Sequence, residues 1–201
     1  MYGGYVWKPR GIPCLNAPLQ QLFDNGWSGF ELEPEYISPP NAIKPPAPWT
    51  PLPFVTKFFP WSKEKAIANK AESCRKIQEW SDSLPAATVF FYTDGSVCSD
   101  SNKVSCAFFS PTPLVERAWS LSTGSSIFTA EVTAIVQVLS YVYNLKDITD
   151  EICIIIDSKS AVQAISASKV NPLNPACLQA RHLASCLKTS GTKVTIAWIP
   201  I

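Results

Sequence analysis

The stretch that decides the fold is VFFYTDGSV, residues 89–97. Its first five residues are β-branched or aromatic, which is typical of a buried β-strand. The run leads directly to Asp94, which is followed by a glycine. A carboxylate at the end of a core strand is tolerated only with water, a proton or a cation beside it. The stretch therefore predicts a strand that ends in an acidic side chain in need of a partner.

The rest of residues 86–201 reads as an alternation of strands and helices. The run EICIIID at 151–157 is apolar at every interior position, as expected of a strand covered on both faces. The segment at 127–145 keeps the i, i+4, i+7 spacing of a long amphipathic helix. Further strands are predicted at 103–110, 115–122 and 194–200, and further helices at 158–166 and 174–191. This order, β-β-β-α-β-α-α-β, predicts an α/β fold with a mixed five-stranded sheet flanked by helices.

Proline separates the first part of the chain from the rest, because twelve of the 18 prolines fall in its first 60 residues. Proline blocks regular helix and removes backbone donors, so residues 1–61 are predicted to form a Pro-rich, poorly regular connector. Two interpretations of it stay open: a poorly ordered leader, or a segment that packs on a neighbouring domain. Residues 62–85 are predicted to form a linker helix, capped by Ser62 and with Ile67 and Ile77 on its apolar face.

Charge and hydropathy exclude several classes of protein. A formal net charge of +1 leaves no overall electrostatic footprint of a nucleic-acid or membrane binder, so such a partner would need a local site. Residues 57–76 carry six Lys or Arg against two Glu, which could touch phosphates but is more often a solvated helix face. No apolar run approaches the ~20 residues of a membrane span, and no signal peptide is recognisable. We therefore expect an intracellular chain with no membrane partner.

The seven cysteines contain no CxxC pair. One of them, Cys153, lies inside the apolar run ICIII. Free, buried thiols are therefore expected in preference to disulfides or a zinc site.

Two further carboxylates lie in positions as awkward as that of Asp94. Glu131 comes three residues after Phe128 and four before Ile135, which places it along the apolar stripe of its helix. Asp157 ends an apolar strand and precedes Ser158. Each acid has an ordinary alternative, because Glu131 could reach solvent from the edge of the stripe and Asp157 could cap the next helix.

The three acids together are more informative than each one separately. Two strands and the helix between them can all meet at one end of a sheet, which is where ligands bind in open α/β folds. Three clustered carboxylates repel one another unless protons or cations intervene. Hard divalent cations such as Mg²⁺ prefer oxygen ligands, and a pair of them ~3.5–4 Å apart suits in-line attack of water on a phosphodiester.

Four motifs in order, YTDGS, FTAEVTAI, IIIDSKSAVQAI and VTIAWIP, resemble the ribonuclease H domain. The version they resemble in detail is that of non-LTR retrotransposon polyproteins. PPAPWTPLP and the helix after it are similar to the connector that follows the reverse transcriptase in such elements. The resemblance covers residues from about 86 to the end well, residues 45–85 more loosely and residues 1–44 not at all.

The resemblance implies a site and an activity. Asp94, Glu131 and Asp157 correspond to the first three acidic ligands of two Mg²⁺ or Mn²⁺ ions, which in the family support cleavage of the RNA strand of an RNA·DNA hybrid. Gly95 and Ser96, together with Ser158, are the implied substrate-binding residues, and the 2′-hydroxyl would distinguish the strands. A reverse transcriptase domain is the implied protein partner.

The chain departs from the family pattern after Trp-Ile-Pro. Family members continue with a Ser-His or Gly-His pair and then with an Asp that opens a last helix, whereas this sequence ends at Ile201. Its one histidine, His182, lies in a predicted helix and is expected to be an ordinary helix position. Without the last helix, apolar sheet surface is expected to be exposed.

Two alternatives to an active ribonuclease remain. A degenerate, non-catalytic ribonuclease H-like module would bind nucleic acid or dock on a reverse transcriptase. An unrelated nucleotide-binding α/β domain would need a phosphate-cradling Gly-rich loop after a strand, and DGS lacks that spacing.

Overall fold

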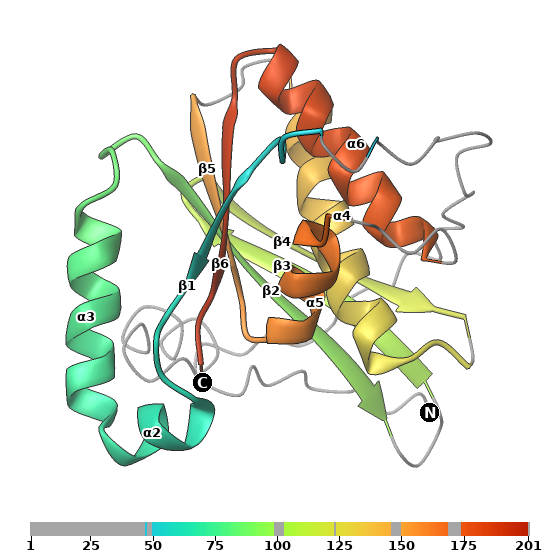
Figure 1. Ribbon diagram of the computed structural model, residues 1–201. Helices are drawn as coiled ribbons and strands as arrows, with labels where there is room; N and C mark the ends of the chain where they lie inside the picture. Colours follow the sequence, from blue (N-terminus) through green and yellow to red (C-terminus); the bar gives the residue numbers. More distant parts are fainter. Residues whose placement is uncertain are drawn as a thin grey trace.

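The computed structural model describes residues 47, 50–98, 103–122, 124–145, 150–168 and 174–200. Six strands in these ranges form one mixed sheet in the order β1-β6-β5-β2-β3-β4 (Figure 1). The first four strands in that order are mutually parallel, and β3 and β4 are antiparallel to their neighbours. The strands are β1 Val55–Phe58, β2 Val89–Cys98, β3 Lys103–Pro111, β4 Leu114–Leu121, β5 Glu151–Ile156 and β6 Lys193–Trp198.

The predicted α/β class and mixed sheet are confirmed, but the predicted number of five strands is wrong. The additional strand, β1, lies inside the segment 1–61 that was expected to be irregular. Prolines stand on both sides of it, at Pro53 and Pro60, so local sequence hides it. β1 is an edge strand whose register is set by distant β6, where Phe58 pairs with Trp198. The prediction for residues 1–46 lies outside the described residues.

The predicted linker helix is two helices, α2 Lys63–Ala68 and α3 Lys70–Asp82. Ser62 caps α2 as predicted, since its Oγ accepts a hydrogen bond of 3.4 Å from the Lys65 backbone N–H. The break falls at Asn69, whose φ of −121° and ψ of 50° are not helical. It separates the two predicted apolar positions, so that Ile77 is buried while Ile67 is 68% exposed. The prediction of one apolar face is therefore wrong at Ile67.

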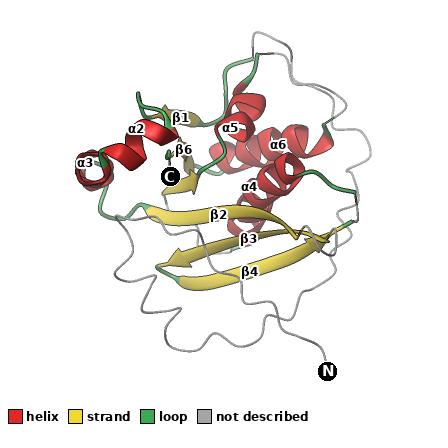
Figure 2. Cartoon of the chain, turned by 90° about the horizontal axis from the view of Figure 1, so that it is seen from below, coloured by secondary structure: helices red, strands yellow, loops and turns green. Residues whose placement is uncertain are grey.

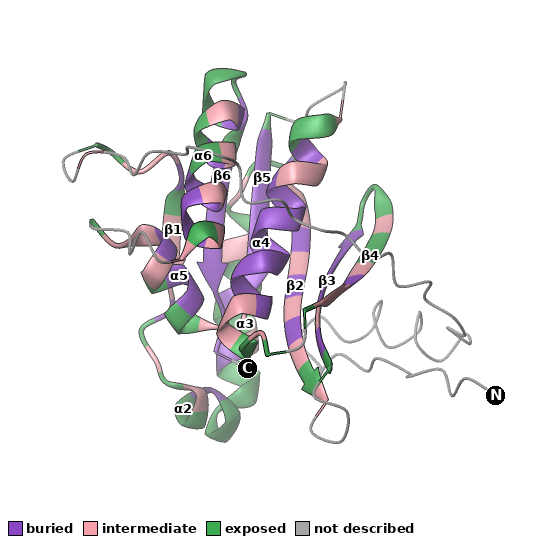
Figure 3. Cartoon of the chain, turned by 90° about the vertical axis from the view of Figure 1, so that its right-hand side faces the viewer, coloured by how far each residue is buried: buried purple, intermediate pink, exposed green. Residues whose placement is uncertain are grey.

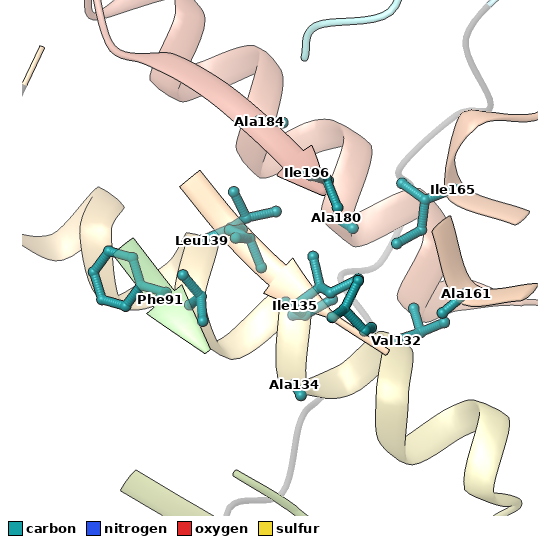
Figure 4. Close-up of a cluster of buried hydrophobic side chains, with 14 of the residues drawn as sticks. Phe91, Val132, Ala134, Ile135, Leu139, Ala161, Ile165, Ala180, Ala184 and Ile196 are labelled. Atoms are coloured by element: carbon teal, nitrogen blue, oxygen red, sulfur yellow. The ribbon is translucent and has the colours of Figure 1, made fainter. Parts of the chain in front are cut away.

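Three helices, α4 Ile127–Asn144, α5 Lys159–Ser166 and α6 Pro175–Thr189, cover one face of the sheet (Figures 1 and 2). α4 is capped by Ser126, whose Oγ accepts from the Thr129 N–H, and most of its length is buried (Figure 3). Figure 4 shows part of the core beneath these helices, where side chains from α4, α5, α6, β2 and β6 meet. No helix in the described ranges combines the length and apolar character needed to cross a membrane.

β5 divides the core between the two faces of the sheet. Ile152, Ile154 and Ile156 belong to the cluster under α4, α5 and α6, whereas Cys153 and Ile155 belong to a second cluster on the opposite face. Alternate strand residues point to opposite faces, and all six positions of β5 are buried. The prediction of a strand covered on both faces is confirmed.

The second face is covered by α3. Phe59 and Ile77 pack there against Ile155 and Ile199, which are only 3% and 1% exposed. Trp80 of α3 adds an edge-to-face contact to Phe59, with ring centroids 5.5 Å apart. The expectation of exposed apolar sheet surface is therefore wrong at β5 and β6.

Cys74 lies in α3 and is disulfide-bonded. The expectation of free thiols is therefore wrong for this cysteine. Cys153 and Cys177 are buried free thiols, as predicted, and Cys186 is a partly buried one. Burial raises the pKa of Cys177 to about 11, so its thiol stays protonated at neutral pH.

Truncating Ile77 tests whether α3 holds the second face of the sheet. Ile77→Ala is expected to lower the free energy of unfolding by about 2–5 kcal/mol, because it leaves a cavity in a packed cluster. Ile67→Ala is the matched control in neighbouring α2 and should change it by less than ~0.5 kcal/mol. Urea unfolding measures both, and equal small losses would mean that α3 does not pack on the sheet.

Candidate metal centre

Asp94 lies where β2 separates from β5. β2 pairs with β5 only as far as Tyr92, and beyond this point it pairs with β3 alone. The Thr93 hydroxyl donates a hydrogen bond of 3.2 Å to the Ile155 carbonyl and holds the two strands together just before they separate. The strand does not end at Asp94 as expected, because its antiparallel pairing with β3 continues to Cys98. Asp94 is still at the end of the parallel part of the sheet.

Asp157 follows the last residue of β5, as predicted. The Trp198 indole N–H donates to the Asp157 carbonyl at 3.2 Å, which ties this backbone to the end of β6. The cap of α5 is Ser158, whose Oγ accepts from the Ala161 N–H at 3.4 Å. The alternative that Asp157 caps the helix is therefore wrong, and its carboxylate is available to the site.

Glu131 lies in the second turn of α4, on the side that faces the sheet. Glu131 is only 6% exposed, so the alternative that its side chain reaches solvent is wrong. Its Oε2 is buried and has no hydrogen-bond partner among the described residues. A buried oxygen that lacks a donor costs free energy, and a proton or a cation would remove that cost.

The three carboxylates form one cluster, in which a ligand oxygen from each lies within 4.8 Å of the others. Burial, together with the charges of Asp157 and Asp94, raises the pKa of Glu131 from 4.5 to about 8. A backbone hydrogen bond from Gly95 and the charge of Lys63 act on this pKa in the opposite direction. The side chains predicted to meet at one end of the sheet do meet there.

Lys63 is a member of the site that sequence reasoning missed. Its Nζ lies 3.0 Å from Asp157 Oδ2. The residue opens α2, far from the acids in sequence, and only the excess of Lys and Arg over residues 57–76 hinted at it. That excess could not indicate which lysine faces the acids, because the packing of the segment before α2 places Lys63 beside them.

The predicted substrate-binding residues flank the acids and have structural roles. A Cβ on Gly95 would lie 2.8 Å from the Glu131 backbone nitrogen and 2.9 Å from the Ala130 Cβ, so this glycine lets α4 approach β2. The Ser96 hydroxyl lies 2.7 Å from that of Ser105. Ser158 caps α5. Their contacts with a substrate stay a prediction.

No protein-family model matches the chain, and no curated protein matches it significantly. The chemistry of the site must therefore be argued from its own geometry. Its ligand atoms are carboxylate oxygens, which suit a hard divalent cation, and Glu131 brings to the cluster a buried carboxylate with one oxygen that has no hydrogen-bond partner among the described residues. Asp94, Glu131 and Asp157 could hold a metal ion. His182 is exposed on α6 and is not part of this cluster, in agreement with an ordinary helix position.

Proposed function

We propose that this chain is a ribonuclease H-type hydrolase that cuts the RNA strand of an RNA·DNA hybrid with Mg²⁺ or Mn²⁺. The observation that carries the proposal is the convergence of Asp94, Glu131 and Asp157 within 4.8 Å at one end of a mixed sheet. The resemblance of the four motifs around them to ribonuclease H domains of non-LTR retrotransposons supports the choice of substrate. A reverse transcriptase domain is the proposed protein partner on the same ground.

Each acid has a distinct part in this proposal. Asp94 and Asp157 are half-buried and come from neighbouring parallel strands, so the sheet sets their separation. Glu131 reaches them from α4, with the Gly95 backbone holding its carboxylate. Two divalent ions are expected, and when bound they would activate water and stabilise the leaving oxygen of the phosphodiester. Gly95, Ser96 and Ser158 lie next to the acids in the chain, where the RNA backbone and its 2′-hydroxyl would be read.

The proposal is tested with the full chain and an RNA·DNA hybrid labelled on either strand. In Mg²⁺ or Mn²⁺ the RNA strand should shorten while the DNA strand stays intact. Duplex RNA and duplex DNA of the same sequence should be left whole, and a chelator should stop the reaction. Asp94→Asn, purified in the same way, should reduce cleavage to background, which controls for contaminating nucleases.

The same experiment judges the non-catalytic alternative. Residues 86–201 carry eight Lys or Arg and eight Asp or Glu, so this part has no excess of positive charge for binding a hybrid at large. Salt-dependent hybrid binding that survives in Asp94→Asn, with no cleavage by the wild-type chain, would overturn the hydrolase proposal in favour of a binding module.

A further inference from the structure

Lys63 brings a positive charge to the three carboxylates from a segment that carries none of them. Its Nζ lies 3.0 Å from Asp157 Oδ2, with the two side chains 44% and 35% exposed. Ion pairs that water reaches contribute little to stability and break easily. The same ammonium lowers the pKa of Glu131, so its field extends beyond Asp157 to the buried member of the cluster. Lys63 is thus a weakly held cation in contact with an oxygen of one proposed metal ligand, Asp157.

The position of Lys63 is set by the packing of the segment before it. β1 and β5 are both parallel to β6, so the chain leaves β1 at the same end of the sheet as it leaves β5 (Figure 1). The rings of Phe59 and Trp61 then pack against each other on the second face, tilted by 48° with centroids 5.1 Å apart, and the cap at Ser62 begins α2. Lys63 is the first residue of that helix. The pairing of β1 with β6 and the packing of Phe59 and Trp61 therefore place the Lys63 ammonium beside Asp157.

We infer that Lys63 is a built-in counter-cation of the site, which a divalent ion must displace in order to bind Asp157. The inference rests on the proposed binding of divalent ions at the triad and concerns how that binding is regulated. Two cations cannot share the Oδ2 position, and a divalent ion beside an ammonium is repelled by it. Metal binding is therefore weaker than the three carboxylates alone would make it. Loading of the metal also releases the start of α2 from the sheet end, which links occupancy of the site to the linker.

Replacing a lysine by methionine removes its charge but nearly keeps its length, so the effect of Lys63 can be compared with that of Lys65 in the same helix. In a calorimetric titration of the full chain with MnCl₂ alone, Lys63→Met should bind the ion roughly tenfold more tightly than the wild type, since the repulsion is gone. Lys65→Met is the matched control, because it removes the same charge from the same helix, and it should bind within about twofold of the wild type. Equal affinities in the two variants would overturn the inference.

A second measurement needs no metal binding. In a chelator, Lys63→Met should unfold at a lower temperature than Lys65→Met, because the carboxylates lose their counter-cation. Removing a lysine from the first position of a helix should by itself be favourable, because the helix dipole opposes a positive charge there. A loss of stability in Lys63→Met must therefore come from the acids. Adding MnCl₂ should raise the unfolding temperature of Lys63→Met more than that of the wild type.

The two measurements distinguish failure of the inference from failure of the proposed function. If Lys63→Met and Lys65→Met are equally stable in chelator while the wild type binds Mn²⁺, Lys63 is no counter-cation and the metal site stands. If Lys63→Met is destabilised and no form of the chain binds Mn²⁺ or Mg²⁺, the displacement inference and the proposed metal-dependent function are both overturned, and Lys63 is a permanent structural partner of the acids.

Discussion

Glu131→Gln is expected to abolish divalent-cation binding at the triad and, in the same protein, to stabilise the metal-free fold at pH 8 and above. The amide keeps the shape of the side chain but cannot become an anionic ligand. It also cannot carry the buried negative charge that Asp94 and Asp157 oppose. Burial and these two neighbours raise the pKa of Glu131 to about 8 from 4.5, so ionising it without a cation costs stability.

The pH dependence follows from where the proton is lost. In the unfolded chain Glu131 ionises near its ordinary pKa of 4.5, whereas in the folded chain it holds its proton up to a pKa of about 8. Between these values the folded state binds more protons, so its contribution to stability falls as the pH rises through this window. In Glu131→Gln this fall is absent. Urea unfolding at pH 5, 7 and 9 in a chelator should therefore show a flatter profile for the variant than for the wild type.

Glu151→Gln is the matched control, because Glu151 is the other buried glutamate of the described residues and is 7% exposed. It opens β5, at the opposite end of the strand from Asp157, and its carboxylate lies 3.0 Å from Lys193 Nζ. Its replacement should leave Mn²⁺ binding intact and should not stabilise the protein at high pH. A loss of stability in Glu131→Gln at pH 9 in chelator would show that Glu131 is already charged and compensated without metal.

The acids could be predicted from sequence because each is marked by a strong local pattern. Asp94 and Asp157 follow apolar strands, and Glu131 interrupts the apolar stripe of a long helix. The order of these elements allows both strand ends and the helix between them to meet at one end of the sheet, where ligands bind in open α/β folds. The distances and the burial of Glu131 required the packed structure.

What sequence reasoning missed depends on contacts between distant segments. β1 is four residues long and is a strand only because β6 pairs with it. The break at Asn69 turns Ile67 to solvent, although its spacing from Ile77 fits a single helix. Lys63 is one of six basic residues in its stretch, and packing of the segment before it selects it as the partner of Asp157. In each case tertiary contacts override a local pattern.

Gly95 shows the same limit in a residue whose contact with a substrate stays a prediction. Gly95 was predicted to bind substrate, whereas the structure supplies a packing reason for a glycine at this position. A Cβ would lie 2.8 Å from the Glu131 backbone nitrogen and 2.9 Å from the Ala130 Cβ. Neither atom is the end of a flexible side chain, so β2 or α4 must move to make room.

Gly95→Ala is therefore expected to lower the free energy of unfolding by about 3 kcal/mol, at the upper end of the range for overpacking. Because the helix backbone at Glu131 must shift, Mn²⁺ binding should weaken as well. Urea unfolding and calorimetry measure the two effects. Ser96→Ala is the control in the next position; it loses only the hydroxyl contact with Ser105 and should cost about 1 kcal/mol. Wild-type stability in Gly95→Ala would mean that α4 does not lie this close to β2.

A second substitution in α4 separates the two close contacts at Gly95. Ala130→Gly removes the Cβ that lies 2.9 Å away, but it leaves the Glu131 backbone nitrogen at 2.8 Å. Alone it should cost about 1 kcal/mol through lower helix propensity. The double variant should lose less free energy of unfolding than the two single variants lose together, because one clash is relieved. Its stability should still stay below that of the wild type. Full additivity would instead show that the methyl group of Ala130 does not limit the approach, and that the backbone at Glu131 alone requires glycine.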